Sequence, residues 1–140
     1  MRIAITIPGN PVPKARPFVR KDGRVFTPKK TAVFETAVRM HAMAAMKGHK
    51  IITGGVKLLV MAYFPTPQSW SLTKRAMATA GKLRHTKRPD TDNVLKAIKD
   101  ALNGIVYVDD AQVDDDHCIK KYGVPRTEII VEAEDEAQGV

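Results

Sequence analysis

A chain of 140 residues is long enough for one domain with a single hydrophobic core. It is 44% hydrophobic and 27% charged, as globular proteins are, and it contains no low-complexity tract. The single cysteine, Cys118, excludes an internal disulfide and a cysteine-based zinc cluster. The apolar run at the start is too short for a signal peptide, and no stretch approaches the ~18 apolar residues of a membrane span. We therefore expect a small, soluble, intracellular protein.

The net charge of +8 is divided unevenly along the chain. Residues 1–88 contain 18 Lys and Arg and two acids, whereas residues 89–140 contain five Lys and Arg and 13 acids. A solvated surface usually mixes both signs, so this segregation predicts one surface for a polyanion and a separate acidic cluster. A basic protein with an acidic tail is the alternative, since five of the acids lie at 128–136. The other eight lie between Asp90 and Asp116, in sequence that we expect to be folded.

The first part of the chain is expected to form a strand, a hairpin and a long helix. Residues 2–7 alternate and are rich in β-branched side chains, which predicts a strand. An irregular basic loop follows, and Asp22-Gly23 between two alternating runs predicts a hairpin with a two-residue turn. A helix is predicted to begin after Thr27 as its N-cap and to end near Gly48. Its apolar stripe is predicted to comprise Val33, Phe34, Val38 and Met43.

The middle of the chain is expected to add a buried strand and two helices. Residues 55–64 predict the strand, and a short helix is predicted over residues 72–80 with Gly81 as its stop. A second main helix is predicted from Asp92 to a stop at Asn103, because apolar side chains recur at helical spacing there. Its apolar positions are Leu95, Ile98, Leu102 and Ile105.

The last part of the chain is expected to supply two more strands. They are predicted over residues 112–122 and 127–133, with a turn between them, and the tail from Glu134 is expected to be frayed. No internal repeat or interdomain linker is present in the sequence. The order of elements predicts a single α+β domain over residues 1–140, with a mixed β-sheet and two main helices.

The acids around the second main helix are predicted to form a cation site. Asp90 and Asp92 lie two residues apart, and in an extended strand end such residues point to the same face. Lys96 lies one helical turn beyond Asp92 on the same side. The pair Asp109-Asp110 follows the helix after a short turn, which allows the chain to bring it back toward the first two acids. Mg²⁺ binds such carboxylates together with water and phosphate oxygens, and it can then activate water and polarise a phosphate.

Each of these residues also has a structural alternative. Asp92 can be the N-cap of the helix, two acids at a turn are ordinary loop chemistry, and Lys96 can form a surface ion pair with Asp100. His85 and His117 have no Cys or His partner at metal-ligand spacing, which argues against zinc. Taken by themselves, the residues leave both a metal site and a structural role open.

Three runs in this region resemble a known signature. They are residues 85–93 (HTKRPDTDN) together with Lys96, residues 100–104 (DALNG) and residues 109–113 (DDAQV). In this order and spacing they resemble the RusA family of Holliday-junction resolvases of bacteria and their prophages. The motif is specific, because the spacings D-x-D-N-x-x-K and D-D-x-Q must hold together. The core of the match spans residues 85–114.

The resemblance implies a RusA-like endonuclease domain over residues 1–140 that acts as a homodimer. Such an enzyme depends on Mg²⁺, with Mn²⁺ as a substitute, and resolves four-way DNA junctions by paired nicks in recombination and repair. A cytoplasmic, nucleoid-associated protein of bacterial or phage origin is implied, with no membrane and no small-molecule substrate. The essential carboxylates of the family fall on Asp90, Asp92 and Asp110, which are its metal ligands, and its catalytic lysine falls on Lys96.

Three further motif positions match the family in this chain. Asn93 and Gln112 match positions that orient the metal ligands, and Asp109 matches a neighbouring acid. The family prototype lacks a segment equivalent to residues 70–84, so the resemblance implies no role for that segment.

The charge pattern and the resemblance agree on how DNA would be bound. The basic part of the chain would hold junction arms through phosphates, which is a salt-sensitive and sequence-independent contact. Two symmetric subunits would present two carboxylate clusters to a two-fold junction. Two alternatives remain, a DNA-binding protein whose acids are structural and a flap or branch nuclease without junction preference. The cations predicted to contact DNA are Lys14, Arg16, Arg20, Lys21, Arg24, Lys87 and Arg88.

Overall fold

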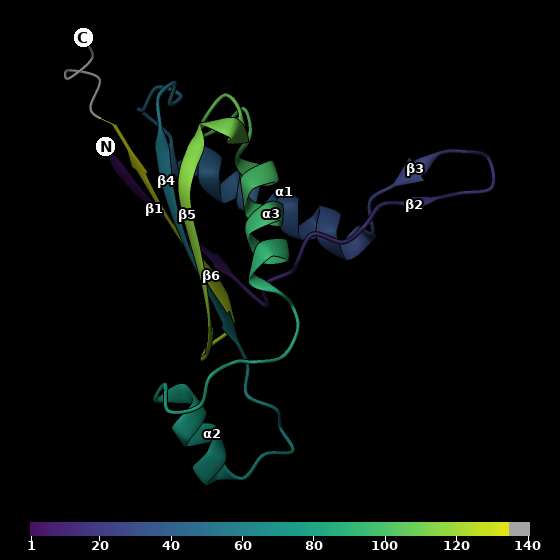
Figure 1. Cartoon of the computed structure of the whole chain (residues 1–140), viewed down its shortest axis with the longest axis vertical. Helices are drawn as coiled ribbons and strands as arrows, with labels where there is room; N and C mark the ends of the chain where they lie inside the picture. Colours follow the sequence, from purple (N-terminus) through teal and green to yellow (C-terminus); the bar gives the residue numbers. More distant parts are fainter. Residues whose placement is uncertain (135–140) are drawn as a thin grey trace.

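The computed structural model describes residues 1–134 and contains a four-stranded sheet, a two-stranded hairpin, three α-helices and one turn of 3₁₀ helix (Figure 1). The elements in chain order are β1 (Arg2–Pro8), β2 (Phe18–Val19), β3 (Val25–Phe26), α1 (Lys29–Ala45), β4 (Val56–Phe64), α2 (Leu72–Thr79), α3 (Thr91–Leu102), η1 (Asp110–Gln112), β5 (Val113–Tyr122) and β6 (Arg126–Ala133).

The main sheet is mixed, with the strand order β1-β6-β4-β5. β6 is antiparallel to both β1 and β4, whereas β4 and β5 are parallel. A parallel pair cannot be joined by a tight turn and needs a crossover. Residues 65–112 supply that crossover, and they include α2, α3 and η1. The topology therefore brings α3 and the start of β5 next to each other.

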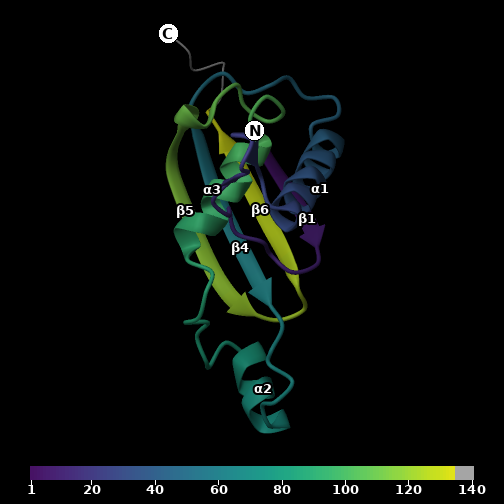
Figure 2. The ribbon, with the colours of Figure 1, turned by 90° about the vertical axis from the view of Figure 1, so that its right-hand side faces the viewer.

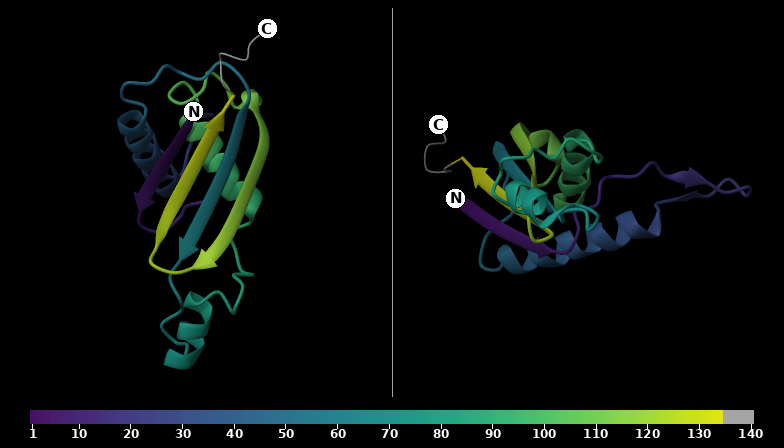
Figure 3. Two further views of the ribbon diagram at one scale, coloured as in Figure 1. Left: turned by 90° about the vertical axis from the view of Figure 1, so that its left-hand side faces the viewer. Right: turned by 90° about the horizontal axis from the view of Figure 1, so that it is seen from below.

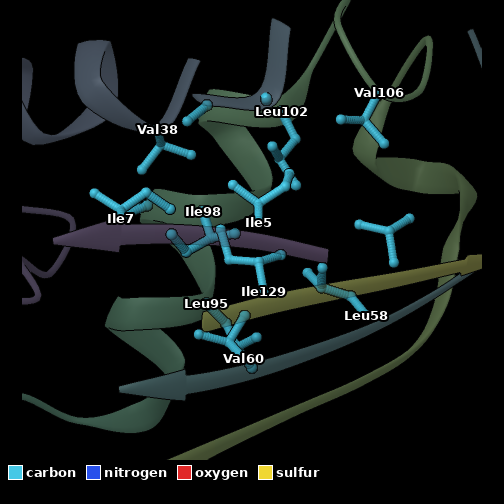
Figure 4. Close-up of a cluster of buried hydrophobic side chains, with 14 of the residues drawn as sticks. Ile5, Ile7, Val38, Leu58, Val60, Leu95, Ile98, Leu102, Val106 and Ile129 are labelled. Atoms are coloured by element: carbon cyan, nitrogen blue, oxygen red, sulfur yellow. The ribbon is translucent and has the colours of Figure 1, made fainter. Parts of the chain in front are cut away.

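One face of the sheet carries the hydrophobic core. Helices α1 and α3 cover this face, while no helix within residues 1–134 lies on the opposite face of the sheet (Figures 2 and 3). The alternation in β1 explains the division, because Ile3, Ile5 and Ile7 are buried whereas their neighbours in the strand are exposed. Figure 4 shows Ile5 and Ile7 among side chains of α1, α3 and the central strands, and Ile3 belongs to the same core cluster. The buried positions of α3 are Val94, Leu95, Ala97, Ile98, Ala101 and Leu102.

The expected architecture is confirmed. The structure is one α+β domain with a mixed sheet, two main helices α1 and α3, and the short helix α2. β1, β4, β5 and β6 lie where strands are predicted, to within one or two residues at their ends. The Ser71 hydroxyl accepts a hydrogen bond from the Lys74 amide (3.2 Å) and caps α2 at its start. The predicted fraying after Glu134 lies outside the described residues.

The hairpin is present, but its loop has three residues instead of two. The Gly23 amide donates to the Arg20 carbonyl (2.9 Å), and the Arg20 amide donates to the Arg24 carbonyl (2.8 Å). Gly23 has a φ of 85°, the left-handed conformation that closes a three-residue loop. The Asp22 carboxylate accepts a further bond from the Arg24 amide (3.0 Å). The expected two-residue turn is wrong because the dipeptide occupies the second and third positions of this longer loop.

The predicted apolar stripe of α1 is half wrong. Phe34 and Val38 are buried, but Val33 is 59% exposed and Met43 is 55% exposed. The helix touches β1 and α3 along one narrow side, at the edge of the sheet. A narrow contact buries only one residue per turn, so the small side chain of Ala42 is buried in place of Met43. The predicted N-cap also differs, since Pro28 and not Thr27 occupies that position.

The start of α3 differs from the prediction by one residue. The helix begins at Thr91, with Asp90 as its N-cap residue in an extended conformation. Asp90 and Asp92 therefore lie on either side of the helix boundary and do not share the face of a strand end, so that part of the prediction is wrong. The alternative that Asp92 is the N-cap is wrong for the same reason. Across residues 1–134, no helix combines the length and the apolar character that crossing a bilayer requires.

Candidate active site

A cleft of about 310 Å³ lies beside α3. Its walls come from α3, from η1 and from β5, three elements that the parallel crossover brings together. Its lining contains four acidic side chains, two basic side chains and one apolar side chain. The lining residues are Asp92, Leu95, Lys96, Lys99, Asp100, Asp110 and Asp116.

Helical spacing explains five of these seven residues. Positions three and four apart lie on the same side of a helix, and residues 92, 95, 96, 99 and 100 follow that spacing. The other side of α3 is fully buried, as shown by Ile98 and Leu102, so the helix cannot rotate away from this orientation without exposing its core residues. The hydrophobic packing of α3 thus fixes the polar side toward the cleft.

Asp110 reaches the cleft from a turn that Gln112 holds in place. The Gln112 side-chain carbonyl accepts hydrogen bonds from the amides of Val108 (2.9 Å) and Asp109 (3.0 Å). Its amide group donates to the carbonyls of Ile52 (2.9 Å) and Gly54 (2.9 Å), which lie just before β4.

The carboxylate of Asp109 caps the same turn by accepting a bond from the Ala111 amide (3.0 Å). Asp109 is therefore engaged within the turn, while Asp110 lines the cleft.

Two of the cleft carboxylates already have cationic partners. Asp116, on β5, pairs with the Lys99 ammonium at 2.8 Å, and Asp100 pairs with Lys14 at 3.3 Å. Lys14 comes from the loop after β1 and also contacts Glu35 at 2.6 Å. Burial opposes the charged form of Lys14, but its hydrogen bonds and ion pairs with both acids outweigh that effect and raise its pKa.

The other three polar residues of the cleft have no such partners. Across residues 1–134, the side chains of Asp92, Lys96 and Asp110 form neither an ion pair nor a hydrogen bond. The expected alternative of an ion pair between Lys96 and Asp100 is therefore wrong. Two carboxylates and one ammonium in this cleft are available for a ligand.

Burial and the negative charge of nearby acids raise the pKa values of two groups close to the cleft. The Tyr107 hydroxyl is buried and donates to the Lys99 carbonyl (2.7 Å), and burial, reinforced by nearby acids such as Asp110, raises its pKa above its usual range. Burial raises the pKa of the Cys118 thiol to about 11, and the charge of Asp92 contributes to the rise. Both groups stay neutral near pH 7, so the charge of the cleft comes from its lysines and carboxylates.

Comparison with known proteins assigns the family. Residues 8–132 match the family described as endodeoxyribonuclease RusA. The chain belongs to the RusA family. It is also 38% identical over 135 residues to YqaN, an uncharacterized protein of Bacillus subtilis (strain 168), and the match covers 92% of this chain and 94% of YqaN. RusA proteins are endodeoxyribonucleases, hydrolases that cut DNA within a strand, so the cleft is a candidate for that chemistry.

The structure brings together three of the four residues predicted to act in RusA chemistry. Asp92, Lys96 and Asp110 line the cleft, whereas Asp90 does not. Asp90 is the exposed N-cap residue of α3, and its side chain makes no capping hydrogen bond. Asp90 thus lies one residue before the helix that carries the other α3 residues of the site.

The residues of the cleft fit a hard divalent cation by their chemistry. Within residues 1–134, no three His, Cys, Asp or Glu side chains are placed closely enough to share an ion. Mg²⁺ needs fewer protein ligands than that, because it commonly binds one or two carboxylates together with water and substrate phosphates. Asp92 and Asp110 are two such carboxylates, and neither has a competing ion pair.

The sequence prediction missed three cleft residues, Lys99, Asp100 and Asp116, as part of the site. The signals for them were present. Lys99 and Asp100 continue the helical spacing from Lys96, and Asp116 faces α3 because alternate residues of β5 point to that side. Pairing between Lys99 and Asp116 depends on the register of β5 along β4, which spacing in the sequence does not define.

The residues predicted to contact DNA fall into three groups. Arg16, Arg20, Lys21 and Arg24 lie on or before the β2–β3 hairpin, which extends away from the body (Figure 1). Lys87 and Arg88 are exposed in the loop before α3. Lys14 differs, because its side chain is only 20% exposed and its ammonium is held by two acids. Lys14 therefore offers less to a phosphate than the other six.

Proposed function

We propose that this protein is a Mg²⁺-dependent endonuclease that resolves Holliday junctions by paired nicks during DNA recombination and repair. The observation that carries the proposal is the cleft in which Asp92, Asp110 and Lys96 lie together, without ion-pair partners among residues 1–134. It occurs in a member of an endodeoxyribonuclease family whose chain also has a strongly basic part. Mn²⁺ is expected to substitute for Mg²⁺, since it prefers the same oxygen ligands.

In this proposal Asp92 and Asp110 of the cleft bind the metal, and Asp90, the N-cap residue of α3, is the third carboxylate that the family resemblance assigns to it. The chemistry that Mg²⁺ supplies when bound is polarisation of the scissile phosphate and activation of a water molecule. The carboxylates would hold the ion in the cleft, and water and phosphate oxygens would complete its ligand set. Gln112 keeps Asp110 in position through its four hydrogen bonds to backbone groups.

Lys96 contributes a positive charge on the same wall as Asp92. A compact ammonium that is aimed at a phosphate stabilises the negative charge that develops during cleavage. Lys99 cannot serve in the same way, because Asp116 already neutralises it at 2.8 Å. The two lysines, three residues apart on α3, are thus proposed to differ in function, with Lys96 catalytic and Lys99 structural.

A homodimer would suit a substrate with two-fold symmetry. Exposed apolar side chains that follow one another along one side of α1 support it, since contiguous apolar surface often marks an interface with another protein. Met40 (65% exposed) extends the strip of α1 that includes Val33 and Met43, and Val19 (67% exposed) lies on the projecting hairpin. We propose that the second copy packs against these side chains and that each copy cuts one strand.

Substrate choice distinguishes this proposal from its alternatives. Wild-type protein is incubated in Mg²⁺ with duplex, flap, fork and four-way junction DNA at matched concentrations. Symmetric paired nicks at the four-way junction, and little cutting of the other substrates, are expected. Equal cutting of flaps and forks would instead indicate a branch nuclease. Binding without cutting in either Mg²⁺ or Mn²⁺ would indicate a non-catalytic DNA-binding protein.

A further inference from the structure

Residues 65–89, which we call the α2 arm, form a strongly basic projection. The arm contains six Lys and Arg and no acid. It extends beyond the end of the main sheet (Figures 1 and 2). Within residues 1–134, none of its six cations forms an ion pair with a carboxylate. The six cations are Lys74, Arg75, Lys82, Arg84, Lys87 and Arg88.

The arm is fixed to the sheet by a stack of aromatic rings. The ring of Trp70 meets Tyr122 edge-on at 5.3 Å between centroids. His85 lies between Phe64 and Tyr122, with centroid distances of 4.4 and 4.9 Å. The stack joins both ends of the arm to the ends of β4 and β5. Such a packed base holds the cations in a defined place, unlike a flexible basic tail.

The arm is in line with the cleft along one side of β5. Alternate residues of this strand face α3, and three of them lie between the cleft and the base of the arm. Asp116 lines the cleft, Lys120 donates to the Lys87 carbonyl at 2.6 Å, and Tyr122 holds the base of the arm. Six residues of strand span roughly 20 Å, which equals about six base pairs of duplex at 3.4 Å per step. DNA that enters the cleft can therefore continue along the arm.

We propose that the α2 arm is a second DNA-binding element, which holds the phosphate backbone of one duplex arm at about six or more base pairs from the cut site. The proposal rests on the proposed function to the extent that DNA occupies the cleft. Phosphate is the favoured ligand because the arm is in line with the cleft that DNA would enter, and because, within residues 1–134, no acid pairs with any of its six cations. An acidic protein partner is the competing occupant, and the test below separates the two.

The first experiment compares two charge-reversal variants with the same change in net charge. Lys82→Glu combined with Arg84→Glu alters the arm, and Lys47→Glu combined with Lys50→Glu alters exposed lysines at the opposite end of the sheet (Figure 2). Kd for a four-way junction and for plain duplex is measured without metal, so that cleavage plays no part. The arm variant is expected to bind at least tenfold more weakly, with a salt slope smaller by about two. Equal losses in both variants would overturn the proposal.

The second experiment locates the contact on DNA. Uncharged methylphosphonates replace phosphates in one duplex arm, either next to the cut site or about six base pairs away from it. The distal replacement is expected to weaken binding of wild-type protein but not to weaken the arm variant further. An undiminished wild-type affinity for DNA with the distal replacement would overturn the proposal and leave the arm to an acidic protein partner. Failure of cleavage with intact distal contacts would instead count against the proposed function alone.

Discussion

Asp92, like Asp110, is a cleft carboxylate without an ion-pair partner within residues 1–134, whereas Asp100 and Asp116 each have a lysine partner. Asp92→Asn keeps the shape of the side chain and removes its charge. We expect cleavage of a four-way junction to fall by at least 10²-fold, the loss typical of removing one preorganised charged group. Junction binding should persist or tighten, because a negative charge near phosphate is lost.

The matched control for Asp92→Asn is Glu132→Gln. Glu132 is exposed on β6 and makes a long, solvent-exposed ion pair with Arg2 at 3.7 Å. Its neutralisation should leave the rate of cleavage and the affinity for DNA unchanged. Near-normal cutting by Asp92→Asn in Mg²⁺ would contradict the metal assignment.

Substitution of Lys96 tests whether this residue acts in cleavage or only stabilises the helix. The ammonium of this residue has no acid partner within residues 1–134, so its removal costs the fold little. Single-turnover cleavage with saturating enzyme and Mg²⁺ should fall roughly 10²–10³-fold in Lys96→Ala. Lys96→Arg should recover only part of the rate, because a planar guanidinium replaces a compact charge poorly. Lys57→Ala serves as the control on an exposed lysine, and a Lys96→Ala rate within a few-fold of wild type would remove Lys96 from the mechanism.

Gln112 is expected to act through the position of Asp110. Its amide group makes four hydrogen bonds to backbone atoms on two segments of the chain. Gln112→Ala leaves these backbone groups without their partner and should destabilise the protein by about 1–3 kcal/mol. The Mg²⁺ concentration for half-maximal cleavage should also rise, an effect that loss of stability alone does not produce in folded protein. Gln68→Ala, in an exposed loop position, is the control, and an unchanged Mg²⁺ requirement would leave Gln112 with a structural role alone.

At the scale of elements, the ring stack at the base of α2 links stability to pH. Burial, together with the nearby charge of Lys120, lowers the pKa of His85 below its ordinary value of 6.5, and its Nδ1 is buried without a hydrogen-bond partner. A histidine with a lowered pKa binds its proton more weakly in the folded chain than in the unfolded chain. Its contribution to stability is therefore complete above pH 6.5 and is lost as the pH falls below that value.

Thermal melting between pH 5 and 8 tests this linkage. Wild-type protein should lose stability as the pH falls through the window below 6.5. His85→Phe keeps a ring between Phe64 and Tyr122 and should reduce that loss. His49→Gln, which changes an exposed histidine, is the control and should follow the wild-type curve. If the two variants show the same pH dependence, His85 is not the group responsible.

The elements also show what a sequence can and cannot predict. The period-2 and helical patterns predicted every main strand and helix, because one side of each faces a single core. The exposed Val33 on α1 was assigned wrongly, since the width of a helix contact depends on what lies opposite. The prediction that Asp90 and Asp92 share one face was wrong because α3 begins between them, at Thr91, and local spacing does not determine where a helix begins. The pairing of Lys99 with Asp116 required the three-dimensional register of β5.

At the scale of the whole molecule, the charges that are segregated along the sequence are also separated in space. The hairpin and the α2 arm carry cations at two separate projections from the body (Figure 1), whereas the acids Asp92 and Asp110 line the cleft beside α3. Such an arrangement lets phosphates bind at two outlying surfaces while one phosphate approaches the carboxylates. The acids alone would repel DNA, so the outlying cations must supply the affinity.

Because the cations and the cleft acids lie on different parts of the molecule, we predict that DNA binding depends steeply on salt, independently of the Mg²⁺ dependence of cleavage. A protein that makes 6–10 phosphate contacts loses about 10³–10⁵ in affinity between 50 and 200 mM salt. Arg20→Glu combined with Arg24→Glu in the hairpin should weaken junction binding and reduce the salt slope by about two. The contacts of Arg20 with Phe26 (3.8 Å) and of Arg24 with Asp22 both lie within the hairpin and outside the core, so the domain should keep its melting temperature. Kd is measured over a salt titration, and the Mg²⁺ dependence of cleavage is measured with saturating protein. A flat response of the wild type to salt, or a changed Mg²⁺ requirement in the variant, would contradict the separation of binding surfaces from the catalytic cleft.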